Sequence, residues 1–161
     1  MRRGYKHYLV IVLLVILTSN YIDRVALGLL LQDVKADLHL SDTQLGLLTG
    51  IAFALFYSIM GIPIGRWADR GNRVTIISLT TALWSVMVAA CASASTFLHL
   101  MILRMGVAVG EAGCIPPAQS LIADYFSRAE RPRAIAIYML GGPLSYGIGY
   151  FLAGRLNEAY G

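Results

Sequence analysis

Residues 97–123 read FLHLMILRMGVAVGEAGCIPPAQSLIA, an apolar stretch that also carries Arg104 and Glu111. A helix that crosses a bilayer needs roughly 20 predominantly apolar residues, and this stretch is long enough. A charge at the centre of a lone membrane helix costs about 2.5–3.5 kcal/mol. The stretch therefore predicts a transmembrane helix whose charged side chains face a water-filled cavity or other charged groups.

Four more stretches of similar length and polarity lie on either side of this one. The composition agrees with membrane residence, because 57% of the residues are hydrophobic and 14% are charged. Soluble domains are nearer ~45–50% apolar and ~25% charged. We therefore predict an all-α integral membrane protein that lies in a lipid bilayer. Its transmembrane helices are predicted over residues 9–31, 44–64, 74–94, 97–123 and 134–156.

Lys and Arg are distributed unequally between the two ends of these helices. The side opposite the N-terminus collects only Lys35 and Arg155. Cytoplasmic loops carry the excess of Lys and Arg, so the N-terminus is predicted to be cytoplasmic, in an inner or plasma membrane. The net charge of +4 comes from Lys and Arg in short clusters between the apolar stretches. Such a distribution is not that of a phosphate-binding face, so no nucleic-acid partner is expected. The N-terminal side collects Arg2, Arg3, Lys6, Arg66, Arg70, Arg73, Arg128, Arg131 and Arg133.

Four ionisable residues lie inside predicted spans: Asp23, Arg24, Arg104 and Glu111. Arg104 and Glu111 are seven residues apart and share one helix face. Intramembrane ionisable groups commonly mark transport paths or proton relays. Burial favours the neutral form of a carboxyl group and a nearby Arg favours its charged form, so Asp23 and Glu111 are candidates for proton binding. The alternative is a set of buried ion pairs that only fixes helix packing.

Small residues predict where helices approach closely, since glycines four residues apart allow backbone contact. Pro116 and Pro117 predict a kink in the fourth span. Close contacts are predicted at Gly106, Gly110 and Gly113 of the fourth span, at Gly61 and Gly65 of the second, and at Gly149 with Ala153 of the fifth.

Two segments carry a family resemblance. Residues 65–73, GRWADRGNR, resemble the signature loop of the major facilitator superfamily, and residues 104–112, RMGVAVGEA, are similar to its fourth-helix motif. The loop departs from the pattern, because Gly71 comes one place early and Asn72 takes the usual glycine position. Asn tolerates left-handed backbone, so the turn is expected to survive.

Four strings narrow the resemblance to the spinster-like branch, known for export of lipids such as lysophospholipids and sphingosine phosphate. They are NYIDR at 20–24, SDTQLG at 41–46, DRGNR at 69–73 and GEAG at 110–113.

The resemblance implies a fold of twelve helices in two six-helix halves around a midplane site. This chain would supply five helices of the N-terminal half-bundle, as a fragment without the sixth helix and the C-terminal half. Asp23 and Glu111 would bind protons, and Arg24 and Arg104 would modulate them or meet an anionic head group. The cytoplasmic gating loop would comprise Gly65, Asp69, Arg70, Gly71 and Arg73. The alternative for this loop is positive charge that only directs topology.

The predicted function is proton-coupled secondary transport of a small amphiphile or lipid-like substrate. The alternative is a non-transporting membrane binding or regulatory protein, or a truncated remnant that needs a partner chain. An enzyme is not expected, because the sequence lacks the HExxH metal motif, the GxSxG nucleophile motif and a phosphate loop. No cofactor and no metal site are predicted.

Overall fold

The computed structural model describes the backbone of residues 3–160 and the side chains of residues 4–155, and every regular element in this range is helical. The side chains of Arg2 and Arg3, which the topology prediction used, lie outside the described residues. Five helical segments are long and apolar enough to cross a membrane, which confirms the five predicted spans. They run over Gly4–Leu29, Asp42–Arg70, Arg73–Cys91, Phe97–Tyr125 and Arg131–Arg155.

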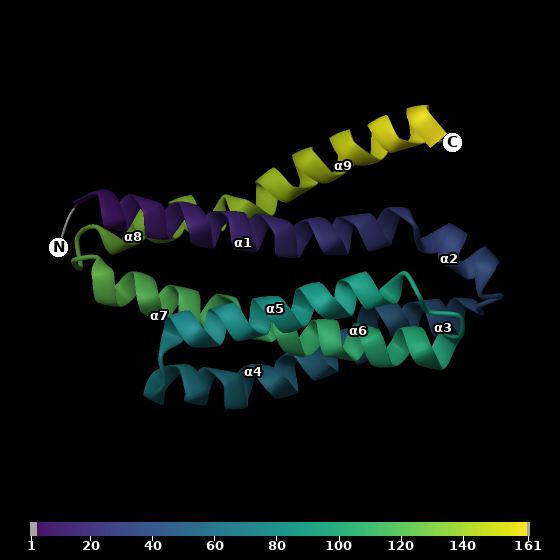
Figure 1. Cartoon of the computed structure of the whole chain (residues 1–161), viewed down its shortest axis with the longest axis horizontal. Helices are drawn as coiled ribbons and strands as arrows, with labels where there is room; N and C mark the ends of the chain where they lie inside the picture. Colours follow the sequence, from purple (N-terminus) through teal and green to yellow (C-terminus); the bar gives the residue numbers. More distant parts are fainter. Residues whose placement is uncertain (1–2, 161) are drawn as a thin grey trace. The chain divides into compact units, whose positions relative to one another are not determined.

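The first compact unit comprises residues 1–30 and 121–161. In it α1 (Arg3–Leu29) packs along α8 (Arg131–Met139) and α9 (Gly141–Tyr160), as Figure 1 shows. Lys6 pairs with Glu130, which lies 124 residues later in the sequence. Two further contacts along the helices have the same sequence separation, that of Leu17 with Gly141 and that of Val25 with Gly149. The first and fifth spans therefore run parallel in one constant register.

The second unit comprises residues 31–120. Its longest helices pack closely, α6 against both α4 and α5. At one end, Leu40, Leu45, Leu48 and Leu100 form a buried cluster. Within a bilayer, close van der Waals packing of such side chains holds helices together, because lipid tails are as apolar as leucine. Its elements are α2 (Leu31–Asp37), α3 (Asp42–Gly46), a π-helix η1 (Leu47–Ile51), α4 (Ala52–Arg70), α5 (Arg73–Cys91) and α6 (Phe97–Ala112), and α7 (Ile115–Tyr125) continues from it into the first unit.

Side-chain caps explain several of the helix starts. Ser41 caps α3 in a capping box, in which its hydroxyl accepts from the Gln44 amide and the Gln44 side chain accepts from the Ser41 amide. Thr96 caps α6 by accepting from the His99 amide at 3.2 Å. Such caps satisfy amides that have no partner within the helix. Pro132 lies in the first turn of α8, as its missing amide proton allows.

Two spans are interrupted near their prolines. The fourth span changes from α6 to α7 at Gly113 and Cys114, directly before Pro116 and Pro117, where the sequence predicts a kink. The fifth span changes from α8 to α9 at Leu140, before a Gly-Gly-Pro sequence. Proline removes one backbone hydrogen bond and its ring clashes with the preceding turn, so the helices restart at these positions.

Two predictions about the second span are wrong. The span continues to Arg70 rather than ending at 64, because the segment from Gly65 is helical. The expected close contacts at Gly61 and Gly65 are absent among the described residues, since a Cβ built on either glycine meets nothing within 4 Å. The π-turn of η1 near the start of this span was also not predicted.

Candidate functional site

Arg104 and Glu111 lie on one continuous helix, α6, and are buried, with 6% and 1% of their surface exposed. Seven residues at 1.5 Å each place them about 10 Å apart along the helix axis and on the same face. This confirms their predicted arrangement. Lys, Glu, Arg and Asp are almost never fully buried unless they are paired, so this face of α6 is chemically unusual.

The three glycines of the fourth span form the contact between α6 and α5. A Cβ at Gly106 would lie 2.8 Å from the Met87 sulfur, and one at Gly113 would clash with the Thr80 side chain. At Gly110 a Cβ would lie 2.7 Å from the Trp84 backbone nitrogen. At 100° per residue, this glycine face is roughly 150° around the helix from Arg104 and Glu111. The close contact with α5 therefore fixes the direction in which the charged face points.

An aromatic ring of α4 covers the Arg104 side chain. The Arg104 guanidinium lies 5.0 Å from the centroid of the Phe53 ring. Phe53 packs in a buried cluster with Trp84, Val107 and Ala108 and lies beside the Tyr57 ring. A cation over an aromatic face is attracted by the ring quadrupole, most strongly when desolvated. Phe53 cannot be singled out from the sequence, because no pattern links residues so far apart in the chain.

Asp23 and Arg24 belong to α1 in the first unit, and both are half-buried. The Arg24 guanidinium lies 5.4 Å from the centroid of the Tyr21 ring. Asn20, one turn earlier, is 2% exposed. The sequence analysis contains Asn20 only within the string NYIDR, although a polar side chain three and four residues before two charged ones is a signal for a site residue. The α1 residues and the α6 pair thus lie in different units.

The predicted gating loop is mostly helical. Gly65, Asp69 and Arg70 lie in α4, and Arg73 is the first residue of α5, so only Gly71 and Asn72 form the turn. Asn72 is extended, with φ −75° and ψ 109°, which corrects the expectation of a left-handed residue. It acts instead as the cap of α5.

Local contacts explain why Asn72 and Gly71 occupy this turn. The Asn72 side-chain oxygen accepts from the amides of Val74 and Thr75 at 3.0 and 3.3 Å. Gly71 also has a negative φ of −104°, but a Cβ there would lie 2.9 Å from the Trp67 carbonyl oxygen. Gly71 is therefore required for close approach of the backbone to α4 and not for a left-handed conformation.

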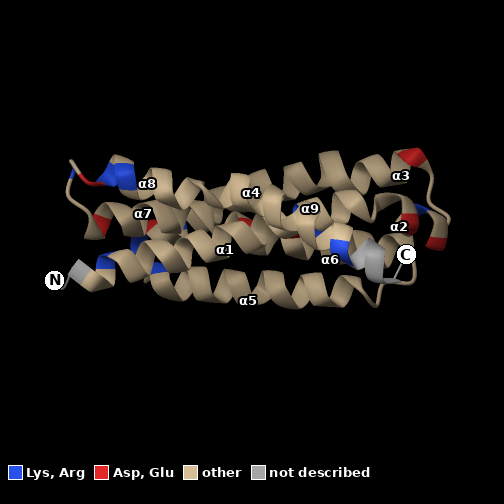
Figure 2. Ribbon diagram, turned by 90° about the horizontal axis from the view of Figure 1, so that it is seen from above, with Lys and Arg blue, Asp and Glu red and all other residues tan. Residues whose placement is uncertain are grey.

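A polar clamp at the start of α1 was also missed. Lys6 Nζ donates to Glu130 Oε2 at 2.9 Å, and the same oxygen accepts from the Ser127 amide and hydroxyl at 3.1 and 3.0 Å. These hydrogen bonds, Lys6 first, lower the pKa of the Glu130 carboxyl from 4.5 to about 2. Arg131 closes the same loop by donating to the carbonyls of Phe126 and Ala123. Figure 2 shows charged residues at the start of α1 and of α8.

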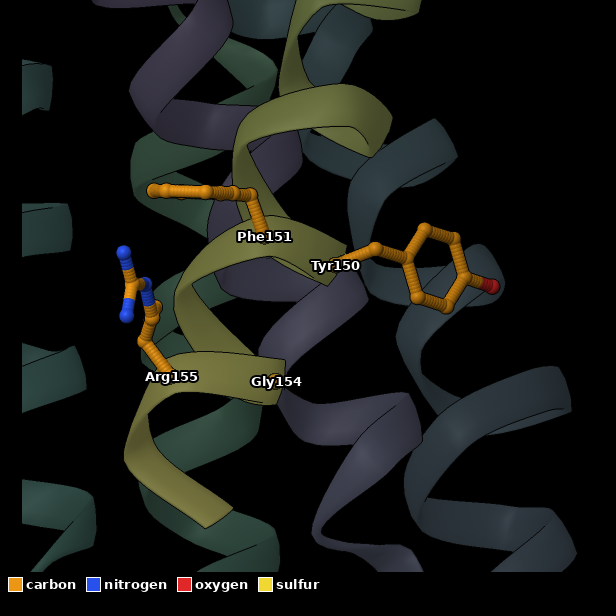
Figure 3. Close-up of a pocket in the computed structure, with 4 residues that line it drawn as sticks. All are labelled: Tyr150, Phe151, Gly154 and Arg155. Atoms are coloured by element: carbon orange, nitrogen blue, oxygen red, sulfur yellow. The ribbon is translucent and has the colours of Figure 1, made fainter. Parts of the chain in front are cut away.

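A shallow surface hollow lies on α9 over Gly154, between Tyr150 and the pair Phe151 and Arg155. Figure 3 shows Phe151 and Arg155 on one side of the helix and Tyr150 on the other, and the Arg155 guanidinium lies 5.6 Å from the Phe151 ring centroid. All four lining residues come from one helix, and none is a predicted proton-binding residue. The hollow therefore includes none of the charged residues that the sequence singled out on α1 and α6.

Comparisons with known proteins agree with this architecture. Residues 13–161 match the family model described as Major Facilitator Superfamily. The chain is 33% identical to an MFS-type efflux pump of Mycolicibacterium smegmatis over 93% of its own length and 35% of that protein. It is 30% identical to protein spinster homolog 1 of Xenopus tropicalis over 98% of this chain and 31% of that protein.

A solved structure gives the same result in three dimensions. It is a bacterial homolog of the human lysosomal transporter Spinster in an inward-facing, unoccupied conformation, with a TM-score of 0.92 and 46% identity. The match covers 97% of this chain and 33% of the other. This chain thus spans about a third of the length of the relatives that it matches.

Proposed function

Because the chain belongs to the Major Facilitator Superfamily, we propose that it forms part of a secondary transporter that moves a small amphiphile with protons. The predicted spinster-like resemblance is confirmed by the spinster homologs among its relatives. One observation carries the proposal: α6 holds a carboxylate and a guanidinium, both buried, on one face of a spanning helix. Such groups are costly in a membrane and are typical of ion and proton pathways.

In this proposal Glu111 and Asp23 are the proton-binding groups. Arg104 and Arg24 modulate them or meet an anionic head group of the substrate. Each Arg lies over an aromatic ring, which orients the guanidinium without neutralising its charge. A transporter needs fixed charges of this kind next to groups whose charge changes, because the attraction between them then differs between the states of the cycle.

The turn between α4 and α5 is proposed to gate the cytoplasmic side. Asp69 and Arg70 are exposed at the end of α4, where they are accessible to a partner on another segment. Gly71 and the Asn72 cap hold the following helix close to this end of α4.

The orientation in the membrane is proposed from the same basic residues. Cytoplasmic loops carry an excess of Lys and Arg, so the end of the spans that holds most of them, together with the N-terminus, is proposed to face the cytoplasm of an inner or plasma membrane.

Transport requires one half of the fold to rock against another, and this chain has about a third of its relatives' length. We therefore propose that it works as the N-terminal part of a complete transporter whose C-terminal half supplies the rest of the cavity. The test uses the full reading frame that contains these residues, purified and reconstituted into liposomes with an imposed pH gradient. Uptake of a fluorescent lysophospholipid is the readout.

The variant Glu111→Gln is expected to lose pH-driven uptake and to keep exchange of substrate across the membrane without a gradient, since exchange needs no net proton movement. Glu130→Gln is the matched control, because Glu130 lies between the spans and pairs with Lys6. Full pH-driven uptake by Glu111→Gln would show that the proton assignment is wrong.

The second candidate is a non-transporting membrane protein, or a remnant, that acts through a partner chain. Co-purification of a second membrane chain, together with no uptake by the reconstituted protein, would support this reading.

A further inference from the structure

We infer that Asn20 is a ligand-binding residue: its side-chain amide donates a hydrogen bond to an anionic oxygen of a ligand that also pairs with Arg24. This inference rests on the proposed transport function and adds a second donor, besides Arg24, for the anionic group of the substrate, a carboxylate or a phosphate. Asn20 lies on α1, where residues four apart are neighbours on the helix surface.

The state of the Asn20 amide is the observation that carries this assignment. The residue is 2% exposed, and its Nδ2 atom has no hydrogen-bond partner among the described residues. Buried polar groups in folded proteins are nearly always hydrogen-bonded, because a buried donor left unpaired loses its bonds to water without replacement. An Asn retained in such a place has a partner in some state of the molecule.

Neighbouring residues on α1 do not show this feature. Thr18 is also polar and partly buried, but its hydroxyl donates to the Leu14 carbonyl oxygen at 2.8 Å. Leu17 and Val25 fill the contact with α9. The unpaired donor is thus not a general property of α1, and it lies on the part of the helix that also carries Asp23 and Arg24.

The chemistry of the two groups selects the ligand. The Asn20 Nδ2 atom can only donate, and the Arg24 guanidinium carries a fixed positive charge with donors alone. Two donors, one of them cationic, match an acceptor that is negatively charged. Since the amide is closed off from solvent in this conformation, a ligand reaches it when the transporter opens on that face, as alternating access requires.

The test measures binding to the full-length protein in detergent, so it does not depend on transport. The probes are a lysophosphatidate and the monoacylglycerol of the same chain, which differ only in the phosphate. The variants are Asn20→Ala, Asn20→Asp and the control Thr18→Ala. Loss of one buried bond to a charged group corresponds to about a 10- to 100-fold weaker Kd.

Asn20→Ala is expected to weaken lysophosphatidate binding by this factor and to leave monoacylglycerol binding unchanged. Asn20→Asp, which has the same shape but adds negative charge, is expected to weaken lysophosphatidate binding further. Thr18→Ala is expected to change neither. Equal losses for both probes, or no loss with Asn20→Ala, would overturn the inference and leave Asn20 a packing residue.

Failure of the proposed function gives a different pattern. In that case the wild-type protein shows no pH-driven uptake, yet the phosphate preference and its dependence on Asn20 remain. If uptake is pH-driven and Asn20→Ala keeps the full phosphate preference, the transport proposal stands and the Asn20 assignment falls.

Discussion

The ammonium group of Lys6 lies 2.9 Å from Glu130 Oε2, although 124 residues separate the two in the chain. The contact joins the start of the first span to the loop before the fifth. Lys6 also lies over the Phe126 ring, at 5.2 Å from its centroid. The Lys6 side chain thus contacts both ends of the segment that connects α7 to α8. This segment is therefore held against the start of α1.

The Lys6–Glu130 clamp predicts a pH dependence. Because the pKa of Glu130 is lowered from 4.5 to about 2 in the folded protein, its stabilising effect is full above pH 4.5. It is lost progressively as the pH falls from 4.5 towards 2. We expect Glu130→Gln to lower the midpoint of thermal unfolding in detergent at pH 7, and the difference from the wild type to disappear near pH 2. The effect should shrink in high salt, since the pair is partly exposed. A difference independent of pH would contradict the clamp.

The close contact between α5 and α6 at Gly110 predicts that an added methyl group lowers stability there, but not at Gly61 of α4. Gly110→Ala would place a Cβ 2.7 Å from the Trp84 backbone nitrogen and 2.8 Å from the Thr80 carbonyl oxygen, which cannot move alone. We expect a loss of about 1–3 kcal/mol in the free energy of unfolding, as for overpacking in general. Gly61→Ala is the matched control, because nothing lies within 4 Å of its added Cβ. A loss of stability at Gly61 as large as at Gly110 would show that the helix packing differs.

These glycines show how far the sequence predicts the fold. The five spans were predicted because a bilayer demands long apolar helices, and that demand is local. Close contact was correctly predicted at Gly110 and Gly149 but wrongly at Gly61 and Gly65. Spacing indicates which residues could face a neighbour, but only the three-dimensional arrangement decides whether a neighbour is there.

The candidate site was predicted in the same partial way. Arg104 and Glu111 were recognised because charge is costly in a membrane, so an ionisable residue within a span stands out. Phe53 and the pairing of Lys6 with Glu130 were not predicted, because an aromatic residue or a terminal Lys is unremarkable until its distant partner is known. The turn at Gly71 was found from the family pattern, but its physical reason is a close backbone contact rather than a left-handed residue.

The Arg104–Phe53 contact predicts a measurable coupling. The guanidinium lies 5.0 Å from the ring centroid and is buried, so the cation–π attraction is expected to contribute about 1–2 kcal/mol. A double-mutant cycle with Arg104→Met and Phe53→Leu, measured by chemical unfolding in detergent, should return a coupling energy of this size. Arg104→Lys should recover only part of it, since the ammonium is compact and more strongly hydrated. Strict additivity would mean that the two side chains act independently.

His39, between α2 and α3, has a φ of 50°. A left-handed conformation costs an L-residue roughly 1–2 kcal/mol, whereas glycine adopts it freely but loses more chain entropy on folding. We therefore expect His39→Gly to raise the free energy of unfolding by up to about 1 kcal/mol. His39→Ile should lower it, because a β-branched residue is least suited to this region. Thermal unfolding of the three proteins gives the order directly, and an Ile variant as stable as the Gly variant would contradict it.

The constant register of α1 and α9 predicts a specific disulfide. A Cβ at position 149 lies 3.3 Å from the Val25 Cβ, close to the 3.5–4.5 Å that a disulfide requires. In a protein whose native Cys91 and Cys114 are replaced by Ala, Val25→Cys with Gly149→Cys should therefore cross-link under mild oxidation. Val25→Cys also removes the methyl group that would crowd a side chain at 149.

The control pair combines Val25→Cys with Ala153→Cys, one helical turn further along α9 and about 6 Å away along the axis. Helices packed in fixed parallel register should give a high yield only for the first pair, measured as a mobility shift that reductant reverses. Equal yields would mean that α9 slides along α1. In that case Gly149, against which Val25 packs, would allow α9 to slide past α1 because it has no side chain. The first and fifth spans would then not move together during transport.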